Sequence, residues 1–380
     1  MSEIKFSNFI NEDGNTGTDI VGLTTFTSPY YFVPPSGTTA QRPSGDGLAP
    51  GTLRFNTDIG RLEVWRGDHW ATILGESPNL GVSGALGARG FQAGGFNPSP
   101  GVRTNTVDYI TISTLGNAQD FGDLTAPRYG CKSCASSTRG LVGGGSDSPL
   151  TGNNVIDYIT ISSTGNAIDF GDRIGGGTEL NGAISNQTRG CFAGGFPSSN
   201  NIIDYVTISS TGNAQDFGDL SISNSHSNGC SSPTRGIFFG GETSTPNVFT
   251  NIIDYITIST IGNALDFGDV SSVRRGFASC SNATRGLAAG GDGPANVNTI
   301  EFVTIATLGN TQDFGDLTTA RGASFAGMSS STRGVFGGGS PASNIMDYVT
   351  ITSTGNAIDF GDSTTSEVNK GGSSNAHGGL

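Results

Sequence analysis

Few residues in the sequence are of the kinds that carry out catalysis. The five cysteines include one Cys-x-x-Cys pair, Cys131 and Cys134, a spacing that suits zinc binding or redox chemistry. No second pair accompanies it, and the three histidines, His69, His226 and His377, lie in unrelated contexts without a recurring acid beside them. The pattern therefore predicts no metal centre, no cofactor and no Ser-His-Asp site, and it indicates a protein that is not an enzyme.

The cysteines are better explained as core residues. Cys134 stands five residues before Arg139. The same place before later Arg-Gly pairs is filled by Ile184, Cys230, Cys280 and Met328. Because apolar residues replace cysteine at equivalent places, we expect the thiols to be buried. The odd number of scattered cysteines also predicts no disulfide framework.

An Asp-Phe-Gly-Asp motif occurs six times and brings many carboxylates. Its first residues are 46 to 50 residues apart, at Asp120, Asp169, Asp216, Asp266, Asp313 and Asp359. The magnesium motif of kinases contains the same Asp-Phe-Gly, but no glycine-rich phosphate loop or catalytic Asp-Asn pair accompanies it here. Calcium is a second option, yet Asp120 and Asp123 alone fall short of the six to eight oxygens that calcium takes. The structural alternative is that each aspartate accepts backbone N–H groups at a turn.

A set of arginines recurs with the same period. Each precedes a glycine and an apolar stretch that ends in a double glycine, and the set is Arg89, Arg139, Arg189, Arg235, Arg285 and Arg333. Six guanidinium groups could line a channel and bind carboxylates or phosphates. The structural alternative, which we expect, is that each arginine pairs with an aspartate of an Asp-Phe-Gly-Asp motif and fixes the interface between repeats.

The elements between these landmarks are four short strands in each repeat. In the second repeat, an apolar strand starts at Gly140 and a stronger one, Ile-Asp-Tyr-Ile-Thr-Ile-Ser, starts at Ile156. The pair Gly165-Asn166 then permits the positive φ of a tight turn, and the Asp-Phe-Gly-Asp strand returns before a small-residue strand completes the unit. Four antiparallel strands in roughly 50 residues match one blade of a β-propeller. The sequence therefore predicts an all-β chain with a six-bladed propeller over residues 81–380.

The sequence leaves open how the ring of blades closes. Residues 370–380 resemble the segment around an Arg-Gly pair, with His377 in the place of the arginine. Either these residues close the ring against the first blade, or residues 81–95 do so.

The composition excludes several classes of partner. Only 13% of the 380 residues are charged, 61 are glycine, and 19 basic against 32 acidic residues give a net charge of −13. This negative charge argues against nucleic acid and anionic membrane surfaces. No apolar run is long enough to span a membrane and the start lacks the pattern of a signal peptide, so we expect no membrane insertion.

The segments between each double glycine and the following Asp-Tyr strand differ in length and content. We expect all of them to emerge on one rim, because they occupy the same place in every repeat. Variable loops on a rigid scaffold usually carry recognition. The ligand-binding residues should therefore lie there, and the candidates are Phe96, Arg103, Asp147, Phe196, Glu242, Phe249 and Asp292.

From Arg89 onward the repeats resemble the kelch family of β-propellers. The shared pattern is a double glycine, a tyrosine about a dozen residues later and an aromatic residue on the next strand, although phenylalanine stands where kelch blades usually carry tryptophan. The string Gly-Asn-Ala-x-Asp-Phe-Gly-Asp also resembles repeats in virion proteins of phages of marine and cyanobacterial hosts. Residues 51–73 read as a β meander of three strands and resemble a module near the N-termini of tailed-phage structural proteins.

These resemblances imply a component of the virion, such as a tail fibre or a capsid or tail appendage on the particle surface. Residues 1–80 would attach the propeller to other virion proteins, and the chain would be present as a homo-oligomer or in several copies. The expected function is adhesion to a host-surface glycan or protein, or decoration of the particle, without catalysis. Two alternatives remain: a glycan-degrading enzyme that depends on an unrepeated acid such as Glu179 or Glu242, and a cellular kelch-like interaction scaffold.

Overall fold

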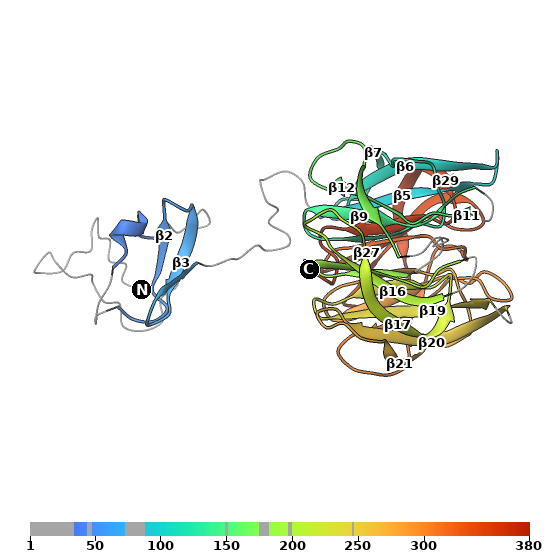
Figure 1. Cartoon of the computed structure of the whole chain (residues 1–380). Helices are drawn as coiled ribbons and strands as arrows, with labels where there is room; N and C mark the ends of the chain where they lie inside the picture. Colours follow the sequence, from blue (N-terminus) through green and yellow to red (C-terminus); the bar gives the residue numbers. More distant parts are fainter. Residues whose placement is uncertain are drawn as a thin grey trace, which may run out of the picture. The chain divides into compact units, whose positions relative to one another are not determined.

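The computed structural model describes residues 34–43, 48–72, 88–148, 151–174, 182–196, 200–244 and 247–380. These residues form β-strands and no α-helix, and their one helical turn is the 3-10 helix η1 (Thr39–Gln41). The chain divides into two compact units, Met1–Gly75 and Glu76–Leu380, each with its own sheets (Figure 1). Within the described part of the chain, no helix is long and apolar enough to cross a membrane.

The first unit contains one four-stranded sheet. Its order is β1 (Ser36–Gly37), β2 (Leu53–Asn56), β3 (Arg61–Trp65) and β4 (Trp70–Thr72). β1 pairs with β2 in parallel, and the other pairs are antiparallel. The turns that join β2 to β3 and β3 to β4 contain Gly60 and Gly67, whose φ angles of 63° and 106° strain residues that carry a Cβ.

A carboxylate lies at the centre of this small sheet. Glu63 is fully buried and accepts hydrogen bonds from Arg42 Nε at 3.2 Å and from Asn56 Nδ2 at 3.1 Å. A second guanidinium, that of Arg54, lies 3.5 Å from Glu63 and covers the ring of Trp70. The hydrogen bond from Arg42 lowers the pKa of Glu63 and outweighs the burial that would raise it.

The described residues of the second unit form six four-stranded antiparallel sheets, which we name sheets I to VI. Sheet I consists of β30 (Gly371–Ser374), β5 (Arg89–Asn97), β6 (Val102–Thr111) and β7 (Gln119–Asp123). Sheet II consists of β8 (Lys132–Ala135), β9 (Arg139–Gly143), β12 (Val155–Thr160) and β13 (Ile168–Asp172). Sheet III consists of β14 (Gly182–Ser185), β15 (Arg189–Ala193), β16 (Asn200–Thr207) and β17 (Gln215–Asn224).

The remaining three sheets repeat this order of strands. Sheet IV consists of β18 (Asn228–Ser231), β19 (Arg235–Ser244), β20 (Asn247–Thr257) and β21 (Leu265–Asp269). Sheet V consists of β22 (Ala278–Ser281), β23 (Arg285–Ala289), β24 (Thr299–Thr304) and β25 (Gln312–Asp316). Sheet VI consists of β26 (Ala326–Ser329), β27 (Arg333–Gly337), β28 (Ser343–Thr350) and β29 (Ile358–Glu367). The hairpin of β10 (Ser146–Ser148) and β11 (Thr151–Gly152) stands between β9 and β12, and the unit as a whole is propeller-like.

The first strand of each sheet is rich in small residues and contacts the first strand of the next sheet, and β30 contacts both β26 and β8. Serine hydroxyls join these strands: Ser185 Oγ donates to the carbonyl of Ala135 at 2.8 Å. Equivalent bonds to the preceding strand come from Ser231, Ser281, Ser329 and Ser374. Because equivalent residues bond to each other, the sheets all run the same way and their corresponding loops lie at the same end.

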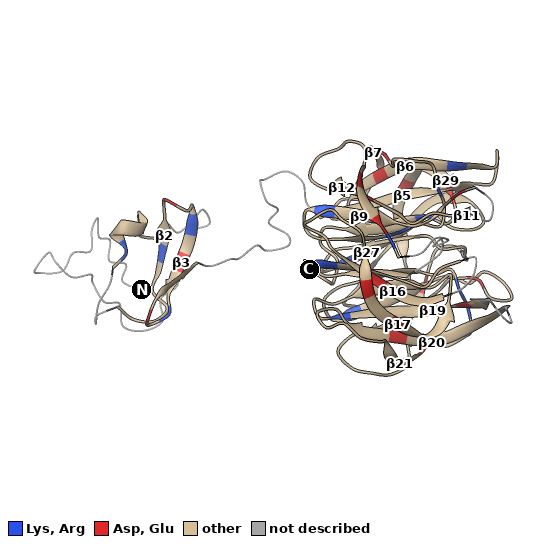
Figure 2. Ribbon diagram, in the orientation of Figure 1, with Lys and Arg blue, Asp and Glu red and all other residues tan. Residues whose placement is uncertain are grey.

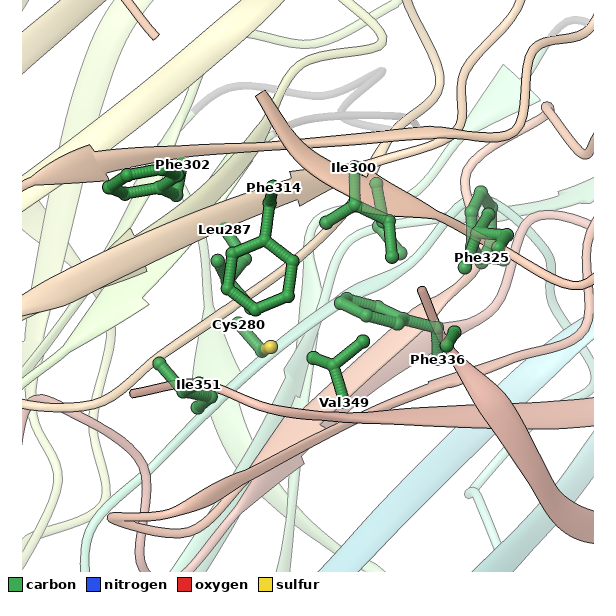
Figure 3. Packing of buried hydrophobic residues seen from close by; sticks show 13 residues of the cluster. Cys280, Leu287, Ile300, Phe302, Phe314, Phe325, Phe336, Val349 and Ile351 are labelled. Atoms are coloured by element: carbon green, nitrogen blue, oxygen red, sulfur yellow. The ribbon is translucent and has the colours of Figure 1, made fainter. Parts of the chain in front are cut away.

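Apolar side chains fill the space between neighbouring sheets. Figure 3 shows the cluster of sheets V and VI, which includes Phe314 and Leu287 of sheet V and Val349 of sheet VI. The third strands carry buried apolar side chains on both faces: in β6, Val107 and Ile110 are three residues apart, so they point to opposite faces, and both are buried. All five cysteines are buried, which confirms their expected place in the core, and burial raises the pKa of Cys134 and Cys230 to about 12.

The arginines of the Arg-Gly pairs connect neighbouring sheets, but not through the aspartates that we expected. In the described part of the chain none of them pairs with an Asp-Phe-Gly-Asp carboxylate, so that expectation is wrong. Instead the Nη1 of Arg139 donates to the carbonyl of Ile208 in sheet III at 3.1 Å, and its guanidinium lies 4.7 Å from the ring centroid of Tyr158. The same bond joins Arg89 to Ile161, Arg189 to Ile258, Arg235 to Ile305, Arg285 to Ile351 and Arg333 to Ile112.

The Asp-Phe-Gly-Asp motif makes its contacts through the backbone. The N–H of Gly165, in a Gly-Asn turn of sheet II, donates to the carbonyl of Phe121 in sheet I at 2.8 Å. Asn166 Oδ1 accepts from the N–H of Asp123 at 3.1 Å. A Cβ on Gly122 would lie 2.5 Å from the carbonyl oxygen of Gly165, so the close approach requires glycine. The motif's carboxylates accept no backbone N–H of a described residue, which corrects the expectation that they would, because the first aspartate of each motif is exposed to water.

Charged side chains are sparse on the strands (Figure 2), yet several are buried. Asp157 of sheet II is fully buried, accepts a hydrogen bond from Thr125 Oγ1 of the preceding segment at 2.8 Å and pairs with Arg128 Nη2 at 2.9 Å. Equivalent pairs are Arg173 with Asp204, Arg274 with Glu301 and Arg321 with Asp347. The sequence reading missed these pairs, which link four of the six sheets to the segment before them.

Candidate functional site

The second and third strands of each sheet are joined at one end, which we call the loop rim. Single β-bridges there join the loops of five sheets to a segment that leads into a first strand, and the bridged pairs are Phe96–Val368, Tyr129–Ser146, Ser225–Glu242, Arg275–Asp292 and Gly322–Ser340. The Gly-Asn turns lie at the opposite end, where the N–H of Ile112 donates to the carbonyl of Ala88 at 2.8 Å. The described chain of the second unit therefore starts at the end away from the loop rim.

Five residues of sheets IV and V form the rim cluster: His226, Glu242, Phe249, Arg275 and Asp292. Arg275 Nη1 is bonded to the carboxylate of Glu242, and Arg275 Nε donates to Asp292 Oδ2 at 3.0 Å. The guanidinium lies 5.0 Å from the ring centroid of Phe249. The side chains of Glu242, Arg275 and Asp292 remain 13%, 29% and 23% exposed, so solvent reaches all three.

The rim cluster carries one positive and two negative groups beside a neutral imidazole. Burial, followed by the charges of Arg275 and Lys132, lowers the pKa of His226 to about 3, and its Nδ1 lies 3.7 Å from Glu242. Burial alone would lower the pKa of Arg275, but its hydrogen bond to Asp292 and the two nearby carboxylates raise it. The imidazole is therefore uncharged at neutral pH, and the arginine holds the two carboxylates apart from each other.

A second group on the rim is aromatic. The rings of Phe96 and Tyr129 have centroids 5.8 Å apart, and the guanidinium of Arg103 lies 5.2 Å from the centroid of Tyr129. Phe96 and Arg103 face each other in the register of β5 and β6, the hairpin that extends sheet I beyond its neighbours (Figure 1). This part of the loop rim therefore presents two aromatic rings and one guanidinium group.

The structure brings most of the candidate rim residues together, in two places. Glu242, Phe249 and Asp292 belong to the rim cluster, and the ring of Phe196 lies 6.0 Å from that of His226 at its edge. Asp147 lies in β10 and is exposed to water. It joins neither group.

No protein-family model matches this sequence, and no curated protein resembles it significantly. The chemistry of the rim therefore has to be judged from its own residues. Among the residues that the structure describes, no three acids, histidines or cysteines gather in a way that could hold a metal ion.

His226, Arg275 and Tyr129 are rim residues that the sequence reading missed. They stand in the segments before the first strands, whereas the candidates were sought only in the loops after the double glycines. A signal was available, because the bridged positions of successive repeats hold Tyr129, Ser225, Arg275, Gly322 and Val368, which differ in every chemical respect. Positions that break a repeat are where a single ligand site should be sought.

A small cavity lies among the first strands, inside the rim. Its volume is about 30 Å³, and its lining includes Ser133, Ser185, Ser231, Ser281 and His377. The Nε2 of His377 lies 2.9 Å from the carbonyl oxygen of Ala135, and burial lowers the pKa of this histidine to about 4. The space suits a few water molecules and is too small for a ligand the size of a sugar.

Proposed function

We propose that residues 81–380 form a closed six-bladed β-propeller whose loop rim binds a host surface, and that the chain is a non-catalytic structural appendage of a phage virion. Closure is supported by three contacts between sheets VI and I that repeat those between the other sheets. Arg333 reaches the carbonyl of Ile112, Thr364 Oγ1 donates to Asp108 at 2.7 Å, and Ser374 Oγ of β30 donates to the carbonyl of Ser329 in β26 at 2.6 Å. A ring is the arrangement in which each repeat covers its neighbour's apolar face without leaving an end exposed.

The observation that carries the functional proposal is that the repeat breaks on the loop rim. The sheets keep the same arginine, asparagine and glycine contacts from repeat to repeat, whereas the rim holds an aromatic group on one side and the rim cluster on another. Carboxylates accept hydrogen bonds from hydroxyl groups, and the half-buried aromatic rings of the rim offer apolar faces, a combination suited to glycans. A host-surface glycan is therefore the ligand that we favour, with a host protein as the second choice.

The rim cluster is also what a glycan-degrading enzyme would require, since Glu242 and Asp292 are unrepeated acids in one place. Glycoside hydrolysis needs one carboxyl group that donates a proton and one that stays ionised. Both carboxylates here accept hydrogen bonds from the same guanidinium, so the geometry gives them one shared role and not two different ones. Binding without turnover is thus the better-supported reading.

The resemblance of residues 51–73 to a module of phage structural proteins supports a role for residues 1–80 in attachment to other virion proteins. Placement on the tail or capsid surface, in several copies or as a homo-oligomer, follows from that role. A cellular scaffold would have no evident use for this module.

Two measurements test the proposal. Mass spectrometry of purified particles should find the chain in stoichiometric amounts, and its absence from them would favour the cellular scaffold. The purified full chain should bind envelope polysaccharide of the host without releasing reducing sugars. If the wild type released sugars and E242Q did not, the proposed function would be catalysis and not adhesion.

A further inference from the structure

The small sheet of the first unit buries polar side chains and not apolar ones. Among residues 34–43 and 48–72, the only buried residues are Arg54, Asn56 and Glu63. No apolar side chain within these two ranges is buried. An antiparallel sheet that has one face in water normally turns its apolar face inward and its polar face outward. The arrangement in the first unit is the reverse of this and needs an explanation.

Five apolar side chains lie together on the other face of this sheet, which we call the apolar face. Neighbouring residues of a strand point to opposite faces, and residues paired across two strands share a face. The register places Leu53 opposite Val64, Val64 opposite Ala71, and Phe55 opposite Leu62. Leu53 and Leu62 are 45% and 39% exposed, and the other three are partly exposed.

The described residues that lead into the sheet do not cover the apolar face. Trp70 and Glu63 point to the opposite face, as their pairing in β3 and β4 shows. Trp70 Nε1 donates to the carbonyl of Pro43 at 2.9 Å, and Arg42 Nε donates to Glu63 at 3.2 Å. Residues 34–43 therefore lie on the side of Glu63.

The size of the first unit makes an uncovered apolar face costly. Units of fewer than about 80 residues usually need disulfides, a metal ion or association with another chain to be stable. The first unit spans Met1–Gly75, and all five cysteines lie in the second unit. The described residues hold no group of three acids, histidines or cysteines that could bind a metal ion. Association through the apolar face would supply the apolar burial that the described sheet lacks.

The charges around the apolar face favour a second copy of the chain as the partner. Asp58 and Arg61 stand at the end where β2 turns into β3, Arg66 and Asp68 stand at the end where β3 turns into β4, and all four are exposed. Each end offers one acid and one base, so a copy packed in either direction meets opposite charges. The described residues of the first unit carry four arginines and three acids, whereas the whole chain has a net charge of −13. Repulsion between two copies is therefore smallest where their first units meet.

We propose that the apolar face is the interface of a homodimer, in which the apolar faces of two copies pack against each other. Two sheets packed in this way interlock their inner side chains about 10 Å apart. A two-fold pair uses the same patch on both copies, which suits a patch that is apolar throughout. Leu53 and Leu62 then become part of a shared core.

The proposal deepens the homo-oligomer that the proposed function includes, and it rests on that function only for its biological setting. A dimer carries two loop rims, and a long polysaccharide that engages both is held more tightly without any new contact. The test needs neither a ligand nor another virion protein. Failure of the dimer and failure of adhesion are therefore separate results.

Sedimentation velocity of the purified full chain, over a wide range of protein concentration, tests the proposal. We expect the wild type to sediment with twice the mass of one chain. L53T/L62T keeps β-branched residues in the strands but removes both exposed leucines from the interface. Its dimer dissociation constant should rise at least about a hundredfold, tenfold for each leucine, because apolar burial is lost.

The second unit offers a matched control for this variant. Leu265 and Leu308 are 59% and 57% exposed, and the equivalent places in the next sheets hold Gln312 and Thr354. L265Q/L308T therefore removes two exposed leucines by substitutions that the repeat already tolerates. It should remain a dimer.

Cross-linking covers the case in which L53T/L62T unfolds the first unit, which the fluorescence of Trp65 and Trp70 would reveal. All five native cysteines are buried, so a cysteine introduced by L62C is the accessible thiol. A short bis-maleimide should link L62C into covalent dimers far more efficiently than L308C, the matched position on the second unit.

Three results would overturn the proposal. A wild type that sediments as one chain, with L62C labelled rapidly by a maleimide, would show that the apolar face is open to water. One chain with L62C labelled slowly would show that other residues of the same chain cover the face. An assembly that persists in folded L53T/L62T would assign the contact between copies to a different surface.

Discussion

Arg333 Nη1 donates a hydrogen bond of 2.7 Å to the carbonyl oxygen of Ile112, which lies 221 residues earlier in the chain. The guanidinium of Arg333 also lies 4.5 Å from the ring centroid of Tyr348 in its own sheet. Arg235 makes the same two contacts within the chain, to Ile305 at 2.7 Å and to the ring of Tyr255. Arg333 thus joins sheet VI to sheet I as Arg235 joins sheet IV to sheet V.

This equivalence predicts that R333M and R235M destabilise the second unit equally. Each substitution leaves a buried carbonyl without its donor, which should lower the free energy of unfolding by about 1–3 kcal/mol. Urea denaturation followed by far-UV circular dichroism measures both. If sheets VI and I were separated in solution, R235M alone would destabilise the protein.

Two different properties can require glycine at a turn, backbone conformation and close packing, and Gly122 and Gly165 allow them to be measured separately. Both have positive φ, of 145° and 153°, but a Cβ on Gly122 would lie 2.5 Å from the carbonyl of Gly165, whereas a Cβ on Gly165 would meet open space. G165A should therefore cost only backbone strain, about 1–3 kcal/mol. G122A should cost clearly more, because sheets I and II must also move apart. Equal losses in a denaturation experiment would show that the close approach contributes nothing.

Asp254 is the buried acid of sheet IV, and it lacks the arginine that its counterparts in sheets II, III, V and VI have. Asn224 stands in the sequence place of that arginine, the Oδ1 of Asp254 has no hydrogen-bond partner, and burial raises the pKa of Asp254. D254N should therefore leave stability at pH 7 unchanged or slightly higher. D347N should lower it by about 3–5 kcal/mol, because it leaves the guanidinium of Arg321 buried without a counter-charge.

The raised pKa of Asp254 also has a consequence for pH dependence. A raised folded pKa means that the folded state binds the proton more tightly than the unfolded state does. The stability of the wild type relative to D254N should therefore fall as the pH rises from about 4, the value of an unfolded aspartate, through the folded pKa. Urea denaturation between pH 4 and pH 8 checks this, and a difference that is constant over that range would contradict it.

The strands could be predicted from the sequence, because apolar alternation and Gly-Asn turns are local signals that six repeats reinforce. The partners of charged side chains could not. The pairing of Arg139 with an Asp-Phe-Gly-Asp carboxylate was a guess about two residues that share a period, and a period does not say which groups lie within reach. The actual partner is the carbonyl of Ile208, 69 residues away in the next sheet, and backbone acceptors carry no sequence signal.

The rim shows the same limit. Glu242 and Asp292 could be found because they lie in variable loops, but their shared partner, Arg275, stands outside those loops, in the segment before a first strand. Only the arrangement of sheets IV and V places it between them. The sequence shows no recurring acid beside its histidines, so it gives no sign that His226 lies 3.7 Å from Glu242 in space.

The stability of the first unit should depend on pH through Glu63. Its hydrogen bond from Arg42 lowers its folded pKa, so its contribution is fully present above the unfolded glutamate value of about 4.3 and is lost as the pH falls through the folded pKa. E63Q should unfold more easily at pH 7 and lose this acid dependence. Trp65 and Trp70, the only tryptophans, lie 5.6 Å apart in this unit, so their fluorescence reports it alone. If the stability of the wild type and of E63Q changed with pH in the same way, another group would be responsible for the acid transition.

Arg275 should decide ligand binding on the rim. R275M removes the group that bonds to Glu242 and Asp292, so the two carboxylates repel each other and the rim cluster loses its arrangement. We expect binding of host polysaccharide to weaken at least about tenfold, the effect of losing one good polar contact. Stability should change by less than about 1 kcal/mol, because these ion pairs are partly exposed. D147N is the matched control, since Asp147 is an exposed rim acid outside the cluster, and it should bind like the wild type. If R275M binds unchanged while R103M does not, the aromatic group of sheets I and II is the site instead.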